Sequence, residues 1–313
     1  MVYTTHDYYI LCPKTTLITE KNENCNGCSP DKCASCNENA RNSWLVQYIL
    51  QSEWYPVIKR TRLLTELKRK RKNILKNSQS IDENQVIEHE RILAPGRVNE
   101  YKAFLKYQRE MLQYVDVIHC NSSITEEIYS QALPEKKKFV LAITTDGIKD
   151  NRKITESPFL KKRENLLIGF IGIRDYHKGY WILRDASEIL RSRGYHIKAV
   201  FYGDEFNIDH EEYPFCIEKG IFPHSKLKEV MDNIDLLVVP GVGYETFGFT
   251  VLEGLANNVP VIVSTHVGAK DVLCHVSTPH LFEPCPLELA NLIGTYIERP
   301  SLLTKAIEEQ KRI

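Results

Sequence analysis

The sequence predicts an α/β protein of two domains, the second of which contains a doubly wound parallel sheet. A chain of 313 residues is longer than one ordinary core requires. From residue 166 onward, short apolar runs alternate with helix-like segments, as in sheets covered by helices on both faces. The polar segment 149–165 contains Pro158 and has no periodicity, which is typical of a linker. We therefore expect domains at residues 1–150 and 151–313.

The composition indicates a globular protein with no strong overall electrostatic field. Hydrophobic residues make up 42% and charged residues 26% of the chain, and 41 basic side chains balance 41 acidic ones. This balance does not favour nucleic acid as a partner. No run approaches the roughly 20 apolar residues of a membrane span, and the start lacks the features of a signal peptide. We expect a cytoplasmic protein whose nine cysteines are thiols or metal ligands.

The first domain is expected to begin with a strand that ends near His6, and residues 77–99 resemble a polar insertion. A polar loop at 13–37 holds the densest group of cysteines. The expected elements after it are helices at 44–76 and 100–115, a strand at 115–122, a helix at 125–133 and a strand at 137–148.

The second domain is expected to be Rossmann-like. Its apolar runs have the length of buried strands, and the segments between them have the length of crossover helices. The expected strands lie at 166–173, 196–203, 236–240 and 259–265, and the expected helices at 181–193, 225–234 and 248–258.

Two glutamates follow the strand at 236–240, where open α/β sheets bind their ligands. A glycine-rich turn opens a helix near Gly248, and its free N–H groups could face a diphosphate. Glu245 comes just before those donors. Glu253 lies among apolar residues, where a carboxylate is costly to bury unless hydroxyl or N–H groups satisfy it, and ribose hydroxyls would do so. The alternative is that Glu253 caps a loop or pairs with a base.

A second polar loop follows the strand at 166–173 and carries Arg174, His177 and Lys178. A lysine at a strand end could neutralise the charge that develops on a departing diphosphate. The alternative is a solvated surface lysine.

These segments resemble the retaining glycosyltransferases of the GT-B fold, the group 1 or family 4 set. The string ETFGFTVLEGLANNVPVIVSTHVGAKDVL, residues 245–273, is similar to their E-x7-E signature and the strand after it. GFIGIRDYHKG, residues 169–179, is similar to their G-R-x4-K-G loop, although Ile173 stands where the family has arginine. The resemblance implies two Rossmann-like domains facing a cleft, with a nucleotide-diphospho-sugar donor on the second.

The resemblance also implies roles for individual residues. Glu245 would contact sugar hydroxyls, Lys178 the diphosphate and Glu253 the ribose. HDYYILCP, residues 6–13, resembles a subset of the family that reads H-D-x4-C-P, in which His6 would line the cleft beside the sugar. The alternative for His6 is a strand-end histidine bonded to a backbone carbonyl. The substrate-binding residues expected from the match are Gly172, Arg174, Thr246, Phe247, Gly248, Phe249 and Glu253.

The first domain departs from the family pattern. The opening strands and the glycine-rich loop of that domain have no counterpart here, so we expect an incomplete acceptor-side domain. Its cysteine loop reads Cys25-x2-Cys28-x4-Cys33-x2-Cys36, which supplies four thiolates for a structural zinc ion. Reduced thiols that stabilise a loop are the alternative, and catalysis is expected to need no cofactor.

A basic segment at residues 59–76 holds nine Lys or Arg residues and one acidic residue, Glu66. Its leucines fall along one side of a helix, which predicts peripheral contact with an anionic membrane. The alternative is a solvated helix that packs its leucines onto the domain. Nucleic-acid binding ranks third because no aromatic residues are interleaved.

The combined expectation is a retaining hexosyltransferase-type enzyme at the inner face of the cell membrane. It would move a sugar from a UDP- or GDP-linked donor to a glycan or lipid-linked acceptor, in cell-surface polysaccharide synthesis. Two alternatives stay open. One is a truncated, inactive remnant that still binds nucleotide sugar, and the other is a zinc-dependent nucleic-acid or protein adaptor.

Overall fold

The structure is a computed structural model that describes residues 1–37, 95–152 and 165–313. The predicted helix at 44–76, with its basic segment, lies outside these residues. Contacts divide the chain into two compact units, Met1–Cys28 with Ala103–Ile313, and Ser29–Lys102. The expected domain boundary at residue 150 falls within the first unit, between its two sheets.

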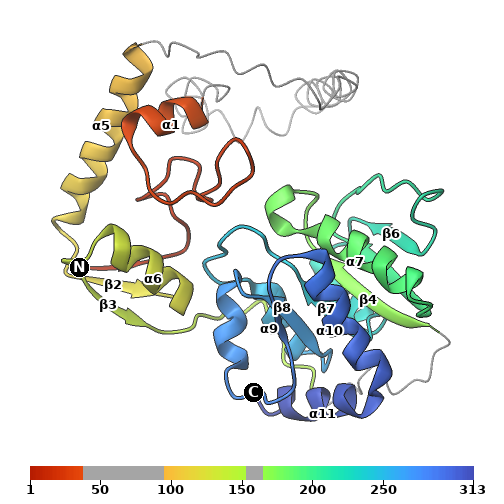
Figure 1. Ribbon diagram of the computed structural model, residues 1–313. Helices are drawn as coiled ribbons and strands as arrows, with labels where there is room; N and C mark the ends of the chain where they lie inside the picture. Colours follow the sequence, from red (N-terminus) through yellow and green to blue (C-terminus); the bar gives the residue numbers. More distant parts are fainter. Residues whose placement is uncertain (38–94, 153–164) are drawn as a thin grey trace. The chain divides into compact units, whose positions relative to one another are not determined.

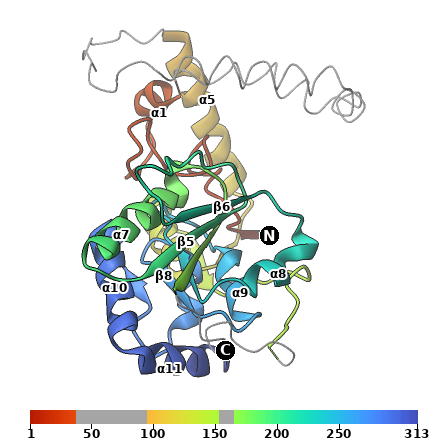
Figure 2. The same ribbon diagram turned by 90° about the vertical axis from the view of Figure 1, so that its right-hand side faces the viewer.

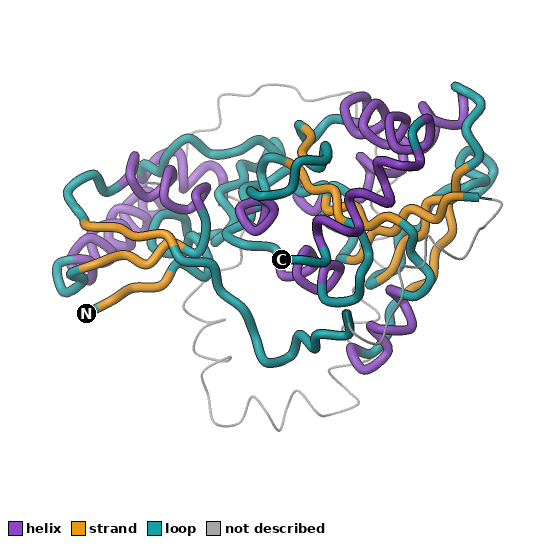
Figure 3. Tube along the Cα trace, turned by 90° about the horizontal axis from the view of Figure 1, so that it is seen from below, coloured by secondary structure: helices purple, strands orange, loops and turns teal. Residues whose placement is uncertain are grey.

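The smaller sheet has three parallel strands, and Figure 3 shows the N-terminal strand beside two neighbours. They are β1 (Val2–Thr4), β2 (Val117–Cys120) and β3 (Lys137–Val140), in the order β1-β2-β3. Helix α6 (Ser123–Ala132) lies against β2 and β3 (Figure 1). It begins with a capping box, because the Ser122 side chain accepts from the Thr125 N–H and the Thr125 hydroxyl accepts from the Ser122 N–H. The predicted strands and helix of this region are present, although the strand predicted at 137–148 ends at Val140.

Helix α5 (Pro95–Leu112) begins earlier than the predicted 100–115, so residues 95–99 are not part of a polar insertion. Proline suits the first turn of a helix, where its missing N–H has no partner to lose. The end of α5 contributes Leu112 to a small core around Ile118 on β2 and Tyr129 on α6. This core fixes the loop after β1, because Tyr8 packs into it and stacks on Tyr129.

The larger sheet has six parallel strands in the order β6-β5-β4-β7-β8-β9. The predicted strands at 166–173, 196–203, 236–240 and 259–265 are confirmed, and two short edge strands are added. The strands are β4 (Leu166–Ile171), β5 (Ile197–Tyr202), β6 (Cys216–Gly220), β7 (Leu236–Val239), β8 (Val261–Ser264) and β9 (Leu281–Phe282).

Helices cover both faces of this sheet, as Figure 2 shows. Leu236 and Val238 face a core that includes α7 (Tyr180–Ser192), α10 (Pro286–Glu298) and α11 (Pro300–Gln310). The alternate residues Leu237 and Val239 face a core that includes α8 (Leu227–Met231) and α9 (Phe249–Leu255). Successive side chains of a strand point to opposite faces, so an all-apolar run is buried on both. Short 3-10 helices also lie among the described residues of this unit: η2 (Tyr176–Lys178), η3 (His224–Lys226) and η4 (Gly268–Leu273).

The second unit, Ser29–Lys102, is described over α1 (Pro30–Cys36) and the first turns of α5. The Ser29 side chain caps α1 by accepting a hydrogen bond from the Lys32 N–H. None of the helices in the described parts of the chain has the length and apolar character that a membrane crossing requires.

Candidate functional site

The loop after β4 is fixed against the loop after β7. Gly179 has φ of +72°, and a Cβ there would lie 1.9 Å from the Pro240 carbonyl oxygen, so this close approach requires glycine. The carbonyl of His177 accepts from the N–H groups of Val242, at 2.8 Å, and Gly243, at 3.2 Å. These contacts hold η2, and with it Lys178, beside the segment that carries Glu245.

Lys178 and Glu245 form an ion pair at the carboxyl ends of β4 and β7. The distance from Lys178 Nζ to Glu245 Oε1 is 2.8 Å, and the two side chains are 33% and 15% exposed. The backbone of Glu245 is held on both sides, because its N–H donates to His266 and its carbonyl accepts from Gly268. The alternative of a solvated surface lysine is therefore not observed.

The next three residues leave their backbone N–H groups free. Among the described residues, the N–H groups of Thr246, Phe247 and Gly248 donate to no protein acceptor. Gly248 has φ of +101° and precedes α9 without any side-chain cap. Such consecutive donors can bind a phosphate or hydroxyl oxygen.

These groups line one pocket of about 160 Å³. Sites for whole drug-sized ligands typically measure about 300–1,000 Å³, so this pocket can enclose one part of such a ligand. Its lining residues are His6, Asp7, Tyr8, Thr15, Thr16, His177, Lys178, Gly243, Tyr244, Glu245, Thr246, Phe247 and Gly248. The structure therefore brings together six of the ten predicted catalytic and substrate-binding residues.

His6 is joined to the predicted signature through its backbone. The Thr246 hydroxyl donates to the His6 carbonyl at 2.9 Å. The His6 side chain is exposed and makes no hydrogen bond with any residue of the described ranges. The alternative of an imidazole bonded to a backbone carbonyl is thus not observed.

Sequence reasoning missed Tyr8. Its side chain is 1% exposed and lines the pocket, yet its hydroxyl has no hydrogen-bond partner among the residues that the structure describes. Burial raises the pKa of the Tyr8 phenol, and the nearby charge of Glu245 raises it further. Tyr8 therefore stays a neutral donor. Its position two residues after His6 is the one signal that the sequence offers.

Four predicted residues are not among those that line this pocket. Glu253 pairs with a base, as one alternative anticipated, since His224 Nε2 lies 3.3 Å from its carboxylate. Phe249 is exposed on α9 and contacts the ring of Phe247. Arg174 is exposed, and its backbone N–H donates to Asp204 at 2.9 Å. Gly172 donates its N–H to the Tyr202 carbonyl.

The predicted zinc ligands fall in different units, with Cys25 and Cys28 in the first and Cys33 and Cys36 in the second. A hydrogen bond from the Cys28 side chain lowers the pKa of Cys12 to about 6, and the Cys25 thiol donates to the Gly27 carbonyl. In the part of the chain that the structure describes, no three His, Cys, Asp or Glu side chains are placed to hold a metal ion. A structural zinc stays a prediction from spacing alone.

Known proteins are similar to large parts of the chain. Residues 151–313 match the family model "Glycosyl transferases group 1". The Staphylococcus aureus capsular polysaccharide biosynthesis glycosyltransferase CapM is 29% identical over 207 residues, 59% of this chain and 53% of that protein. An uncharacterized glycosyltransferase of Methanocaldococcus jannaschii, MJ1607, is 29% identical over 119 residues, 35% and 30% of the two chains. This chain thus aligns with about half of CapM and less of MJ1607.

Solved structures show the same fold. Sucrose-phosphate synthase from Thermosynechococcus elongatus superposes with a TM-score of 0.54 at 18% identity, over 67% of this chain and 56% of that one. Anabaena HepE in complex with UDP and glucose gives 0.52 at 19% identity, over 72% and 64%. The α/β fold with parallel sheets, like that of GT-B glycosyltransferases, is confirmed. Because the family model covers more than half of the residues, the chain belongs to the group 1 glycosyltransferases.

Proposed function

We propose that this protein transfers a sugar from a nucleotide-diphospho-sugar, UDP- or GDP-linked, to a glycan or lipid-linked acceptor with retention at the anomeric carbon. One observation carries the proposal. The Lys178–Glu245 ion pair lies in the same pocket as three successive free backbone N–H groups. A positive charge, amide donors and a carboxylate acceptor are what a sugar joined to a diphosphate requires.

Lys178 would stabilise the diphosphate as it departs. An ammonium group has three donors, so Lys178 can keep its bond to Glu245 and still donate to a phosphate oxygen. The free N–H groups at 246–248 would share the same negative charge. Donors fixed before the reaction lower the barrier because they need not reorganise as charge develops.

Glu245 and Tyr8 would position the sugar. The Glu245 carboxylate can accept from sugar hydroxyls, and the unpartnered Tyr8 hydroxyl can donate to one. We propose that the bond between the anomeric carbon and the diphosphate breaks as the acceptor hydroxyl attacks from the same face. The hydroxyl proton then passes to the departing phosphate oxygen. His6, at the rim of this pocket, would contact the sugar and the leaving phosphate.

Fewer observations support the contacts proposed for the rest of the donor. The Glu253 carboxylate would accept hydrogen bonds from the ribose hydroxyls, either in place of His224 or together with it. The HepE complex with UDP and glucose supports a UDP-linked donor, and CapM supports a role in capsular or cell-surface polysaccharide synthesis. Cytoplasmic location, membrane contact and the absence of a catalytic cofactor stay predictions.

The test is a panel of nucleotide sugars, including UDP-glucose and GDP-mannose, measured by thermal shift and then by release of nucleotide diphosphate. We expect at least one donor to raise the melting temperature and to be turned over, by transfer or by slow hydrolysis. Glu245→Ala should lower turnover far more than donor affinity. A donor that stabilises the wild type without any turnover would identify an inactive remnant, and no stabilisation by any donor would refute the proposal.

A further inference from the structure

The turn after Glu245, which carries the free N–H groups, is held in place through its carbonyl groups. Two of these carbonyls bind the backbone of η4. The Gly268 N–H donates to the Glu245 carbonyl at 3.1 Å, and the Ala269 N–H donates to the Phe247 carbonyl at 2.6 Å. The Thr246 carbonyl, which lies between these two in the chain, is held by a different element.

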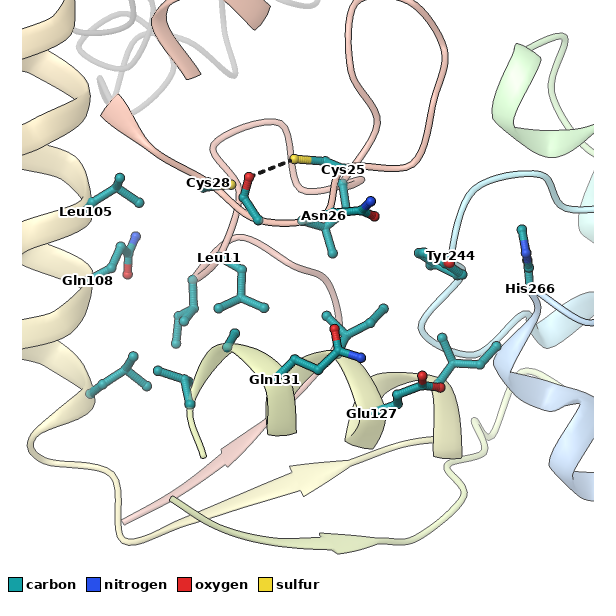
Figure 4. Close-up of a pocket in the computed structure, with 18 of the residues that line it drawn as sticks. Leu11, Cys25, Asn26, Cys28, Leu105, Gln108, Glu127, Gln131, Tyr244 and His266 are labelled. Carbon is teal, nitrogen blue, oxygen red and sulfur yellow. Dashed lines mark hydrogen bonds between the residues drawn. The ribbon is translucent and has the colours of Figure 1, made fainter. Parts of the chain in front are cut away.

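That element is the start of α6. The Ser122 hydroxyl donates to the Thr246 carbonyl at 2.7 Å, and Ser122 is fully buried. Ser122 directly precedes α6, and Figure 4 shows the half of this helix marked by Glu127 on the side of the loops that carry Tyr244 and His266. A helix that packs on the smaller sheet thus begins with a side chain that binds a turn of the larger one.

The surrounding contacts fix this hydrogen bond. A Cβ on Gly268 would lie 2.4 Å from the Thr246 carbonyl oxygen and 2.5 Å from Ser122 Oγ, so glycine allows the close approach. The Asp271 carboxylate, also on η4, accepts from the Ser123 N–H at 2.6 Å and from the Ser123 hydroxyl at 2.7 Å. Negative charge is favourable at the N-terminus of a helix. The start of α6 is therefore held against the turn.

Because the peptide group is planar, the bond from Ser122 also orients an N–H group. In a trans peptide, the C=O of one residue and the N–H of the next point in opposite directions. The bond to the Thr246 carbonyl therefore sets the direction of the Phe247 N–H, which donates to no acceptor among the described residues. Phe247 lines the pocket of Lys178 and Glu245.

Ser122 is also the N-cap of α6, and its two roles use different parts of the hydroxyl group. The oxygen accepts from the Thr125 N–H at 3.3 Å, and the hydrogen is donated to the Thr246 carbonyl. A helix cap requires only the oxygen. The cap therefore does not explain the bond to Thr246.

We propose that Ser122 is a positioning residue, which orients the Phe247 N–H toward the oxygens of the diphosphate. The inference rests on the proposed function and adds a contribution of the first domain to the donor site. Ser122 does not line the pocket and acts through the peptide group between Thr246 and Phe247. A donor that is oriented before binding need not reorganise when it meets the charge.

The sequence allows the Phe247 amide to be observed by itself. The dipeptide Thr-Phe occurs once in the chain, at residues 246–247. A protein labelled only in its threonine carbonyl carbons and phenylalanine amide nitrogens therefore gives a single peak in an HNCO spectrum. We expect inorganic diphosphate to move the amide proton of this peak downfield, and a titration then gives the dissociation constant.

Two variants remove the Ser122 hydroxyl. Ser122→Ala should weaken diphosphate binding about five- to tenfold and reduce the movement of the Phe247 peak at saturation, because the Thr246 carbonyl is no longer held. Ser122→Gly should weaken binding to the same extent. Glycine replaces a serine cap at little cost, so this second variant should melt close to the wild-type temperature.

Thr125→Ala is the matched control. The Thr125 hydroxyl accepts from the Ser122 N–H at 3.1 Å, in the same capping box, and Thr125 does not line the pocket. The control should melt a few degrees lower, as Ser122→Ala does, and should bind diphosphate with wild-type affinity. Wild-type affinity in both Ser122 variants, or equal weakening in Thr125→Ala, would overturn the inference. So would a Phe247 peak that diphosphate does not move.

UDP-glucose and GDP-mannose keep the two proposals apart. Turnover of the donor that the wild type accepts should fall about tenfold in Ser122→Ala and stay unchanged in Thr125→Ala. If no donor is turned over while the Ser122 variants weaken diphosphate binding, the proposed function fails and Ser122 still orients an anion site. If the wild type and the Ser122 variants turn over a donor equally, the positioning role alone fails.

Discussion

Replacing Lys178 with methionine separates a catalytic lysine from a structural one. Methionine keeps most of the length of the side chain and removes its charge. The Lys178 side chain is 33% exposed and pairs with Glu245 at 2.8 Å. Partly exposed pairs of this kind contribute about 1 kcal/mol or less to the free energy of unfolding. The variant should therefore fold, with only a small decrease in stability.

The expected loss of rate is larger. Removing one fixed donor from the site of developing charge typically lowers kcat by about 10²–10³, or about 2.7–4 kcal/mol. Turnover of the best nucleotide sugar of the panel, followed by release of the nucleotide diphosphate, measures this loss. Lys178→Arg keeps the charge and should retain more activity than Lys178→Met.

The matched control is Lys228→Met. Lys228 forms an ion pair of nearly the same length, 2.9 Å to Asp232, and its side chain is 43% exposed. It does not line the pocket of Lys178 and Glu245. Both variants should lose a similar amount of stability, and only Lys178→Met should lose turnover. Equal kcat values in the two variants would refute the role given to Lys178.

Three further substitutions test other parts of the account. Tyr8→Phe should leave the melting temperature unchanged or raised, because the hydroxyl has no partner, and should lower kcat/KM for the donor about tenfold. Gly248→Ala should lower both stability, by about 1–3 kcal/mol in urea titration, and turnover, since φ is +101° and its Cβ would lie 2.6 Å from the Val267 side chain. Glu309→Gln should flatten the pH dependence of urea stability between about pH 5 and pH 2. Hydrogen bonds, chiefly from the Ser277 hydroxyl, lower the pKa of Glu309 to about 2, so its stabilisation is present above the unfolded pKa and is lost as pH falls.

Each of these substitutions has a control in the chain. Tyr9→Phe alters a tyrosine that is 42% exposed and should leave kcat/KM unchanged. Gly194→Ala also places alanine at positive φ, +85°, but in open space, so it should cost less stability than Gly248→Ala. Glu308→Gln removes an exposed carboxylate beside Glu309 and should leave the pH dependence of urea stability between about pH 5 and pH 2 unchanged. Identical behaviour of any variant and its control would contradict the corresponding role.

The inner strands of the large sheet could be predicted, whereas its edge strands could not. Strands β4, β5, β7 and β8 are inner strands with predominantly apolar sequences, since helices cover both faces. Strands β6 and β9 lie at the two edges of the sheet. The sequence of β6, CIEKG, contains two charged residues because an edge strand is partly solvated, and an apolar pattern is then not required.

The site was predictable where topology alone decides it. Lys178 and Glu245 follow different strands of one parallel sheet, and the carboxyl ends of such strands meet at one edge. Both glutamates were expected to contact the donor, but only Glu245 lines the observed pocket, because Glu253 lies within α9 and meets His224 instead.

Tyr8 could not be found by pattern. Tyr8 reads as an ordinary apolar residue after a strand, and it does pack in the small core. A missing hydrogen-bond partner is a property of the folded chain and leaves no mark in the sequence.

A crystal structure with UDP-glucose bound tests the central claim most directly. The account predicts a diphosphate oxygen within hydrogen-bond distance of Lys178 Nζ, a second one at the main chain of residues 246–248, and the glucose ring beside Glu245. A nucleotide bound elsewhere, with the Lys178–Glu245 pair closed and its pocket filled by solvent, would contradict it.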